Sequence, residues 1–541
     1  MTERRGWDEL RQVAAQSSLA QLGQDVCRRY GRDFERWLDV ATTPLPETMR
    51  VNPLRYDAEW TKNKLRELGG AEIEWFSQNG EAFAMPWYRG KPENDAVKSL
   101  MQALHETGRI TRQEAASMLP VLVAELGQGE LVLDLCAAPG SKTTQAMVAL
   151  AGNGLVVANE PNAKRANMLG TNTSRIGLQN LVICKHDGRH FPRCPDPGFD
   201  VVIADVPCTG TGTVRKNGGL WRRWKENSGQ GMQRLQIDIA GRGARLLRPQ
   251  GRMIYSTCSI DIVENEVVVA ELLQEYPWLE LIEINTNALD GLELFSGFND
   301  HPALEKYTLE IRQQLSRCRR LPIGGESNTG GFFIAQFKHQ GEGEFADALT
   351  YEREGDLRLR PIPSPDQHTP LPLMGDELDK LVKEWHFSSD ELSFWQRGKR
   401  IFAGSPPMRD WLYATPRYGG KMRMWPGNTW HPIQVIITGL PIIEERSGTL
   451  RPKARAMPLM RKFANLETIQ LNHEQFRQWL NGVGPRRSDL NLEDKHGSVI
   501  ISTQSIAGEI IVPAWLGELL TPMVDANERL ILELQTQNQS S

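Results

Sequence analysis

The feature that most constrains this chain is an alternation of short apolar runs and helical segments between Leu131 and Asn265. The apolar runs fall near residues 131–135, 155–159, 181–184, 200–204 and 252–256. Continuous apolar runs of this length are typical of strands that are buried on both faces. Strands that alternate with helices form a mostly parallel sheet with right-handed crossovers. We therefore predict an α/β fold with a doubly wound sheet.

Length and composition set the broad class. A chain of 541 residues, with 40% hydrophobic and 24% charged residues, is expected to form two to four globular domains. No apolar run reaches the ~18 residues of a membrane span, so no membrane partner is expected, and the first residues lack a secretory signal. Seven cysteines, none at metal-finger spacing, favour a reduced compartment. We expect the cytoplasm, with the nucleus as the alternative.

Changes in pattern divide the chain into six segments. We expect helices over 1–48, a small α+β unit over 49–108, the sheet domain over 109–340, a linker or insertion over 341–375, a small partly closed β-barrel over 376–525, and a polar tail over 526–541. The linker is rich in prolines and charges. The barrel is predicted from short strands that Gly- and Pro-containing turns separate.

Two local patterns mark the borders of the sheet domain. Thr111 is followed three residues later by Glu114, a spacing that predicts a capping box and a helix leading into the sheet. At the other border, residues 328–335 read as a strand at the edge of the sheet.

Three loops that leave predicted strands carry reactive side chains. The first reads Cys136-Ala137-Ala138-Pro139-Gly140-Ser141-Lys142, the second Asp205-Val206-Pro207-Cys208, and the third Tyr255-Ser256-Thr257-Cys258-Ser259. In an open α/β sheet, loops at the carboxyl ends of parallel strands converge on one crevice. If these strands are neighbours, the two later cysteines, the aspartate and the lysine face the same pocket.

The loop after the first strand does not match a phosphate-binding pattern. Gly140-Ser141-Lys142-Thr143 lacks the Walker spacing, and one glycine does not make a dinucleotide loop. A nucleoside without phosphates is therefore favoured. Glu160 and Asp187 follow the next two strands, where an α/β fold hydrogen-bonds ribose hydroxyls and a base edge. A single acidic residue there is more often a solvated strand end, but acidic residues at successive strand ends favour binding.

The cysteines divide into two kinds. A lone cysteine is usually a small core residue, which we predict for Cys27 and Cys184. Cys208 and Cys258 instead follow strand ends, among Pro, Thr, Ser and Gly. A nearby cation such as Lys142, or the start of a helix, can stabilise a thiolate. The alternative, a disulfide or a metal pair, lacks the spacing of a zinc site, so no metal is expected.

Two thiols and an acid suit addition to an electron-poor ring such as cytosine. A thiolate that adds to carbon 6 makes carbon 5 nucleophilic, and an acid such as Asp205 at ring nitrogen 3 stabilises the developing charge. After transfer to carbon 5, its proton must leave before the thiolate can be eliminated. A second thiol nearby can assist that release.

The three loop motifs resemble those of the Sun/Fmu family of RNA cytosine-5 methyltransferases, which use S-adenosylmethionine. The resemblance implies a Rossmann-like class I methyltransferase sheet, with Cys258 as the nucleophile and Cys208 as the cysteine that promotes product release. It also implies that the 136–142 loop, Glu160, Asp187 and Asp205 hold the cofactor and the target base. Glu160 stands where the family more often has aspartate.

Further features resemble the tRNA branch of that family, so tRNA is the expected partner of a monomeric enzyme. They include Thr213-Val214-Arg215-Lys216-Asn217 and the segment around residues 317–333. The resemblance implies an N-terminal α/β RNA-binding extension and a C-terminal PUA-like barrel. An RNA surface is predicted from four basic residues interleaved with Trp221 and Trp224, namely Arg215, Lys216, Arg222 and Arg223. An ordinary basic loop is the alternative.

Other functions remain open at the level of the sequence. The same chemistry could act on ribosomal RNA, on DNA or on a small molecule, and the fold could serve as a non-catalytic RNA-binding scaffold. DNA enzymes of similar chemistry place the nucleophile in the Pro-Cys motif, whereas here the Thr-Cys motif of Cys258 is also intact. Substitution of each cysteine separates these alternatives.

Overall fold

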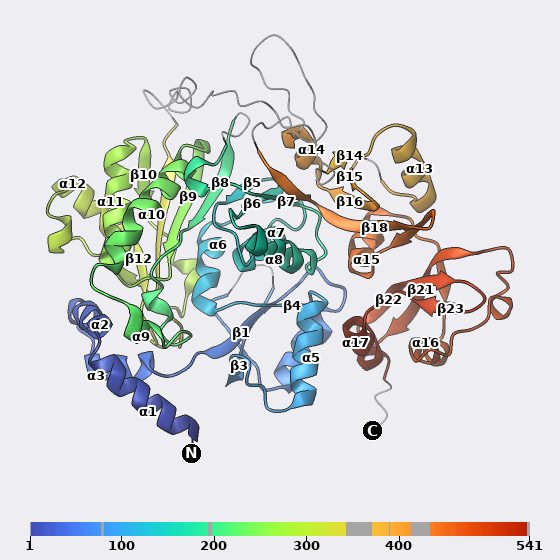
Figure 1. Cartoon of the computed structure of the whole chain (residues 1–541), viewed down its shortest axis with the longest axis horizontal. Helices are drawn as coiled ribbons and strands as arrows, with labels where there is room; N and C mark the ends of the chain where they lie inside the picture. Colours follow the sequence, from blue (N-terminus) through green and yellow to red (C-terminus); the bar gives the residue numbers. More distant parts are fainter. Residues whose placement is uncertain are drawn as a thin grey trace, which may run out of the picture.

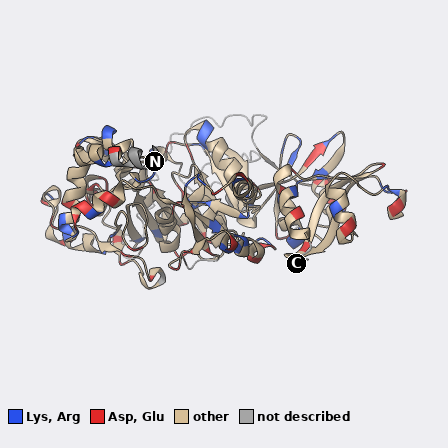
Figure 2. Ribbon diagram, turned by 90° about the horizontal axis from the view of Figure 1, so that it is seen from below, with Lys and Arg blue, Asp and Glu red and all other residues tan. Residues whose placement is uncertain are grey.

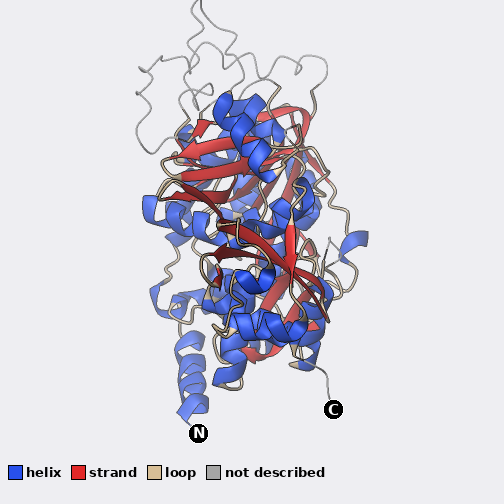
Figure 3. Cartoon of the chain, turned by 90° about the vertical axis from the view of Figure 1, so that its right-hand side faces the viewer, coloured by secondary structure: helices blue, strands red, loops and turns tan. Residues whose placement is uncertain are grey.

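The computed structural model describes residues 2–76, 80–192, 197–341, 370–388, 390–412 and 433–537. Figure 1 shows an elongated molecule, with the N-terminal helices at the lower left and the C-terminal sheets on the right. Figure 3 views the chain from the C-terminal side, where helices and strands alternate along the whole height of the molecule. Most of the linker expected over 341–375 lies outside the described residues.

Five parallel strands form the centre of the largest sheet, and all five fall within a few residues of the predicted ranges. They are β5 (Leu131–Asp134), β6 (Leu155–Asn159), β7 (Leu181–Cys184), β8 (Phe199–Asp205) and β9 (Leu247–Thr257). Their order across the sheet is β9-β8-β5-β6-β7, and each pairing is parallel. The chain reverses direction across the sheet between β5 and β8. The carboxyl ends of these two strands are therefore the topological switch point, where such folds bind ligands.

Helices cover both faces of this sheet because alternate residues of each strand point to opposite faces. In β5, Leu133 belongs to one buried cluster and Val132 to the other. The helices are α6 (Leu119–Val123), α7 (Ser141–Ala149) and α8 (Ala163–Ser174) on the face of Val132, and α10 (Ser228–Ala244) and α11 (Glu266–Glu275) on the face of Leu133. The predicted doubly wound sheet is confirmed.

Antiparallel strands complete the sheet beyond β9. They are β10 (Leu279–Ile282), β11 (Phe295–Ser296), β12 (Arg319–Leu321) and β13 (Phe332–His339). The prediction of an edge strand near 328–335 is wrong, because β13 pairs with β9 on one side and with β12 and β10 on the other. In the sequence this strand is one long apolar run after a short loop. Such a run does not indicate that both β12 and β10 pair with its outer side. The short helix α12 (Leu309–Gln314) lies between β11 and β12 in the sequence.

The N-terminal part comprises helices and a separate sheet. Helices α1 (Thr2–Ala15), α2 (Ser18–Arg29) and α3 (Phe34–Ala41) come first, as expected for residues 1–48. The four-stranded sheet consists of β1 (Pro46–Val51), β2 (Ala71–Glu72), β3 (Ala82–Tyr88) and β4 (Ile110–Arg112), and α4 (Ala58–Glu67) and α5 (Asp95–Glu106) accompany it.

The predicted capping box at Thr111 is wrong. Thr111 lies in β4 and pairs with Arg50 of β1, so it closes the N-terminal sheet. Glu114 itself caps the 3-10 turn η1 (Ala115–Met118), because its side chain accepts a hydrogen bond from the Ser117 amide. Pairing with a strand sixty residues away overrides the local pattern.

The C-terminal strands are distributed over two sheets. The first contains β14 (Leu371–Pro372), β15 (Ser393–Arg397), β16 (Arg400–Gly404), β18 (Leu440–Arg446) and β19 (Thr449–Pro452), with α13 (Asp376–Trp385), α14 (Pro406–Leu412) and α15 (Met457–Phe463). The second contains β20 (Thr468–Gln470), β21 (Gly497–Ser505), β22 (Gly508–Leu516) and β23 (Leu520–Pro522), with α16 (His473–Leu480). Strand β17 (Val435–Thr438) joins neither of them and extends the large sheet beside β7.

The prediction of a polar tail over 526–541 is wrong for its first part. Residues Ala526–Thr536 form helix α17, and Ile531 and Leu532 on it are buried. Ile531 packs in the core of the N-terminal sheet, whereas Leu532 packs in the core of the second C-terminal sheet. The helix therefore joins the two ends of the chain. The polar residues of this helix suggested a solvated tail, but they include Glu528, the ion-pair partner of buried Arg109.

Candidate active site

The structure brings the two predicted cysteines together. Cys208 follows β8 and Cys258 follows β9, and because the strands are parallel neighbours both cysteines lie at one edge of the sheet. Their Sγ atoms are 3.3 Å apart, both are half-buried, and both are free thiols. The hydrogen bond to Cys258 and burial hold the pKa of Cys208 well above its usual range. The two thiols therefore form one hydrogen-bonded pair.

Lys142 and Asp205 form an ion pair in the same crevice. The Lys142 Nζ lies 2.6 Å from Asp205 Oδ2 and donates a hydrogen bond to Ser117 Oγ at 2.7 Å. Ser256 donates to the other oxygen of Asp205 at 2.8 Å. Burial alone would lower the pKa of Lys142, but the charge and hydrogen bond of Asp205 outweigh it and raise that pKa. Lys142 is thus a permanent cation whose charge also acts on Cys258.

Glu264 connects the two cysteine loops, a role that the sequence did not reveal. This fully buried carboxylate accepts hydrogen bonds from the Thr209 amide at 2.8 Å, from the Thr209 hydroxyl, and from Ser259 Oγ at 2.5 Å. Gln236 of α10 donates to Glu264 at 2.9 Å and to the Pro207 carbonyl at 2.9 Å. In the sequence Glu264 resembles a carboxylate in the first turn of a helix, so only the fold identifies it as a positioning residue.

Backbone hydrogen bonds hold the same loops at a fixed separation. The Gly212 amide donates to the Cys258 carbonyl at 2.8 Å, and the Gly331 amide donates to the Gly212 carbonyl at 2.9 Å. A Cβ atom at Gly212 would lie 2.2 Å from the Gly331 carbonyl oxygen. Only glycine therefore permits this close approach of three loops.

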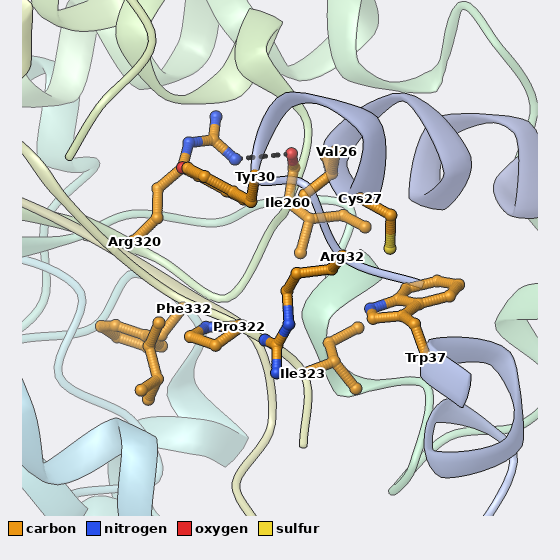
Figure 4. A pocket seen from close by; sticks show the side chains of 11 residues that line it. Val26, Cys27, Tyr30, Arg32, Trp37, Ile260, Arg320, Pro322, Ile323 and Phe332 are labelled. Atoms are coloured by element: carbon orange, nitrogen blue, oxygen red, sulfur yellow. Dashed lines mark hydrogen bonds between the residues drawn. The ribbon is translucent and has the colours of Figure 1, made fainter. Parts of the chain in front are cut away.

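The N-terminal helices support the Cys258 loop from behind. Figure 4 shows a small cavity where Tyr30 and Trp37 of these helices approach Ile260 and Arg320. Arg320 donates to the Ile260 carbonyl at 2.9 Å and forms a buried ion pair with Glu266. The loop that carries Cys258 is thus held by a charged group that water does not reach.

The predicted cofactor residues follow the carboxyl ends of β5, β6 and β7. Gly140 adopts a left-handed conformation with a φ of 110° at the start of α7, and no side chain caps this helix. Its first backbone N–H groups can therefore receive an anionic group such as a carboxylate. Glu160 after β6 is buried, accepts from the Asn162 amide at 2.9 Å, and lies 3.3 Å from Arg165. These residues fit a nucleoside with a charged amino-acid tail.

Asp187 and Cys136 complete this set in different ways. Asp187 follows β7, is exposed, and pairs with Arg189 at 2.6 Å, which lowers its pKa. Cys136 is half-buried, and burial raises the pKa of its thiol. The loop between Cys136 and Lys142 is fastened to α8, since Arg165 donates to the Ala138 carbonyl and Asn172 to the Pro139 carbonyl.

One predicted RNA contact is corrected by the structure. Arg215 is buried and donates to the carbonyls of Thr43, Pro44 and Thr329, so it joins the N-terminal helices to the β13 loop. Burial lowers its pKa to about 10. The structure places the neighbouring Trp221 and Trp224 in the core around α9 (Leu220–Arg223). An arginine flanked by basic residues looks like a surface residue until its partners are known.

The other three predicted basic residues, Lys216, Arg222 and Arg223, are exposed. In the view of Figure 2, Lys and Arg are interspersed with Asp and Glu along the described chain. No helix in the described ranges has the length and apolarity to cross a membrane. The same ranges contain no group of three or more His, Cys, Asp or Glu that could hold a metal ion.

The five parallel strands in the order β9-β8-β5-β6-β7, with antiparallel β13 beyond β9, have the sheet arrangement of the class I methyltransferase fold. Residues 121–338 match the model of a family described as 16S rRNA methyltransferase RsmB/F. This stretch of the chain is therefore similar to that family, in agreement with the Sun/Fmu resemblance of its motifs.

Relatives with named functions divide between two RNA classes. The chain is 32% identical over 361 residues to a multisite-specific tRNA:(cytosine-C(5))-methyltransferase of Saccharomyces cerevisiae, with 56% of this chain and 52% of the relative covered. The chain thus spans about half the length of that relative. It is 28% identical to the ribosomal RNA small subunit methyltransferase F of Cronobacter sakazakii, with 84% of each covered.

Among solved structures, a methyltransferase homologue from Pyrococcus horikoshii superposes with a TM-score of 0.46 and 26% identity. That comparison covers 57% of this chain and 91% of the other.

Proposed function

We propose that this chain methylates carbon 5 of cytosine in tRNA, with S-adenosylmethionine as the methyl donor. The observation that carries the proposal is the pair of thiols 3.3 Å apart beside the Lys142–Asp205 ion pair. One thiol can add to a base while the second acts on the product. Agreement with the named relatives supports the choice of cytosine in RNA.

In this proposal Cys258 is the nucleophile. Lys142 provides a fixed positive charge that stabilises the Cys258 thiolate. The thiolate adds to carbon 6 of the base, and the electron pair of the 5,6 double bond moves toward ring nitrogen 3. In this proposal the carboxyl group of Asp205, positioned by Lys142 and Ser256, would carry a proton and donate it to that nitrogen, which neutralises the developing negative charge. Cys208 lies 3.3 Å from Cys258. Once it has released its own proton to solvent, Cys208 would accept the carbon 5 proton as a thiolate, and the electrons of the broken C–H bond would re-form the 5,6 double bond and expel Cys258.

The loop 136–142, the amino end of α7, Glu160 and Asp187 would hold S-adenosylmethionine. When bound, the cofactor supplies an electrophilic methyl group. The helix end suits its carboxylate, and the two acidic side chains suit ribose hydroxyls and the adenine edge. The longer glutamate at position 160 would still have to reach the ribose, with its carboxylate oriented by the Asn162 amide.

RNA contacts would come from outside the crevice. Lys216 is exposed on the loop after Cys208, and Arg222 and Arg223 are exposed on α9, which suits all three to an RNA backbone close to the target base. The N-terminal sheet and the C-terminal sheets, the latter in a PUA-like role, would extend this contact. A base inside an RNA helix would have to be flipped out to reach Cys258. We expect a monomer that acts in the cytoplasm.

The test is transfer of labelled methyl groups to purified tRNA, ribosomal RNA and DNA, each offered separately. We expect 5-methylcytosine in tRNA, with no transfer by Cys258→Ala. Cys208→Ala should accumulate a denaturation-resistant protein–RNA adduct, because the proton on carbon 5 is no longer removed efficiently. Cys27→Ala, a buried cysteine in the N-terminal helices, serves as the control.

The outcomes separate the alternatives. Retained transfer by Cys258→Ala would contradict the assignment of the nucleophile. Label in DNA alone would contradict the RNA assignment. Cofactor binding without transfer to any nucleic acid would favour the scaffold.

Ribosomal RNA is the second candidate substrate, because the relative named for it aligns over 84% of each chain, including C-terminal residues. Label confined to small-subunit ribosomal RNA would support this candidate and exclude tRNA. The mechanism at the two cysteines would be unchanged.

A further inference from the structure

A second, more polar cavity lies between the methyltransferase domain and the first C-terminal sheet. Its volume is about 330 Å³, within the range of pockets that bind small organic groups. One wall is the outer side of α8 with Asn167, Thr171 and Ser174. The other wall carries three arginines from separate segments: Arg397, Arg400 and Arg455. None of the residues that line this cavity is acidic.

The arginines have little compensating charge. Arg397 donates to the Ile436 carbonyl at 2.6 Å, and the described residues offer it no carboxylate within salt-bridge distance. Arg455 reaches only the Ser174 hydroxyl, at 3.5 Å, among the described side chains. The carbonyl end of α8 can attract Arg455 but accounts for neither of the other two.

Arg400 shares its only described acidic partner. Its Nε lies 3.4 Å from Glu444, which also binds Arg446 at 2.9 Å and Lys453 at 2.6 Å. One carboxylate therefore serves three cations. The neighbourhood of the cavity keeps a clear excess of positive charge, even though the chain as a whole is negative by four charges.

A cluster of this kind is unfavourable without an anion. Burial, and then the charge of Arg400, lower the pKa of Arg397, which shows that two like charges face each other in a partly dry place. Planar guanidinium groups bind phosphate through paired N–H donors. Hydroxyl and amide groups on the opposite wall can complete the coordination of phosphate oxygens.

The location suits a long substrate. α8 begins at the cofactor crevice, where Arg165 faces Glu160, and its last turn carries Ser174 at the cavity. At 1.5 Å per residue, these two ends are roughly 14 Å apart along the helix axis. An RNA backbone that enters the crevice can therefore reach the cavity.

We propose that Arg397, Arg400 and Arg455 form a binding site for a phosphate of the RNA backbone, at the junction of the methyltransferase domain and the C-terminal part. This inference rests on the proposed RNA substrate and adds a specific contact to it. The pairing of β17 with β7 holds the two walls together, so the site exists only when the C-terminal part is docked.

The test measures binding of labelled tRNA and small-subunit ribosomal RNA to the full chain over a range of salt concentrations. The Arg397→Gln/Arg455→Gln variant should bind about tenfold more weakly at physiological salt, with a salt slope about 1 to 2 units less steep. Arg477→Gln is the control, because it removes an exposed arginine of α16 that lies outside the cavity. Arg400→Gln, whose side chain is half exposed, provides a second variant that is less able to disturb folding.

Equal affinity and slope in wild type, both arginine variants and the control would overturn the proposal. A titration with inorganic phosphate separates the sources. If phosphate binds to wild type but not to the double variant while RNA binding is unchanged, the cavity holds a free anion and the RNA contact is excluded.

Failure of the proposed function would appear differently. Wild type would then neither bind nor methylate RNA, whereas failure of this inference alone leaves wild-type transfer intact and the variants identical to it.

Discussion

At the scale of single residues, Asp134 shows how the crevice is prepared by burial. It ends β5, is almost fully buried, and accepts one hydrogen bond from Thr143 at 2.7 Å. Its second oxygen has no partner among the described residues. Burial raises the pKa of Asp134 to about 6, because a charged carboxylate is poorly solvated there.

This raised pKa predicts a pH-dependent stability. Between pH 4 and pH 6 the folded protein holds a proton on Asp134 that the unfolded chain has released. Folding stability must therefore fall as the pH rises through this window. Asp134→Asn removes the effect, so its stability relative to wild type should rise by about 3 kcal/mol between pH 4 and pH 7.

Urea unfolding at several pH values measures this difference. The exposed Asp494→Asn is the control and should stay parallel to wild type across the range. A gap between Asp134→Asn and wild type that does not change with pH would contradict the assignment of the proton to Asp134.

At the scale of secondary-structure elements, helix α17 fastens the end of the chain to its beginning. Fully buried Arg109 pairs with Asp57 at 2.6 Å and with Glu528 of α17 at 2.9 Å. Gln535, which lies about two helical turns after Glu528, donates a hydrogen bond to Asp57 at 2.6 Å. The N-terminal sheet thus depends on a helix more than four hundred residues away.

Removing the helix partner of Arg109 should be costly. Glu528→Ala leaves Asp57 as the nearest carboxylate for a buried guanidinium, so we expect a loss of about 3 kcal/mol in the free energy of unfolding. Glu533→Ala on the same helix is the control, with an expected loss below about 0.5 kcal/mol. Equal losses in the two variants, measured by urea unfolding, would show that the ion pair contributes little.

At the scale of the whole molecule, β17 connects the C-terminal part to the methyltransferase sheet. Ile437 of β17 pairs with Ile183 of β7 and packs over Gly170 of α8. A Cβ atom at Gly170 would lie 2.3 Å from the end of the Ile437 side chain. The absence of a side chain at this one position permits the two parts to dock.

Gly170→Val should therefore loosen the docking. A branched side chain displaces Ile437 and costs about 1 to 3 kcal/mol by overpacking. The amides of residues 435–438 should exchange with solvent about tenfold faster or more, measured by hydrogen–deuterium exchange. Gly231→Val, in a helix position with open space around it, should leave that exchange unchanged. Unchanged exchange in both variants would show that Ile437 is not needed for docking.

The sequence by itself determined the central sheet and its reactive loops. Buried parallel strands require continuous apolar runs, and the residues at their carboxyl ends must share one edge. Cys208, Cys258, Asp205 and Lys142 were therefore predictable as neighbours without coordinates, as were the core positions of Cys27 and Cys184.

Features that depend on distant partners became visible in the three-dimensional fold and not in the sequence pattern. Arg215 and Glu264 carry charges that locally suggest a solvated surface, yet each is buried because acceptors or donors arrive from other segments. Likewise, β13 pairs with strands on both sides and is not an edge strand. Helix α17 packs into two cores where a polar tail was expected. The periodicity of a sequence shows which face of an element is apolar. Long-range packing determines which other element covers that face.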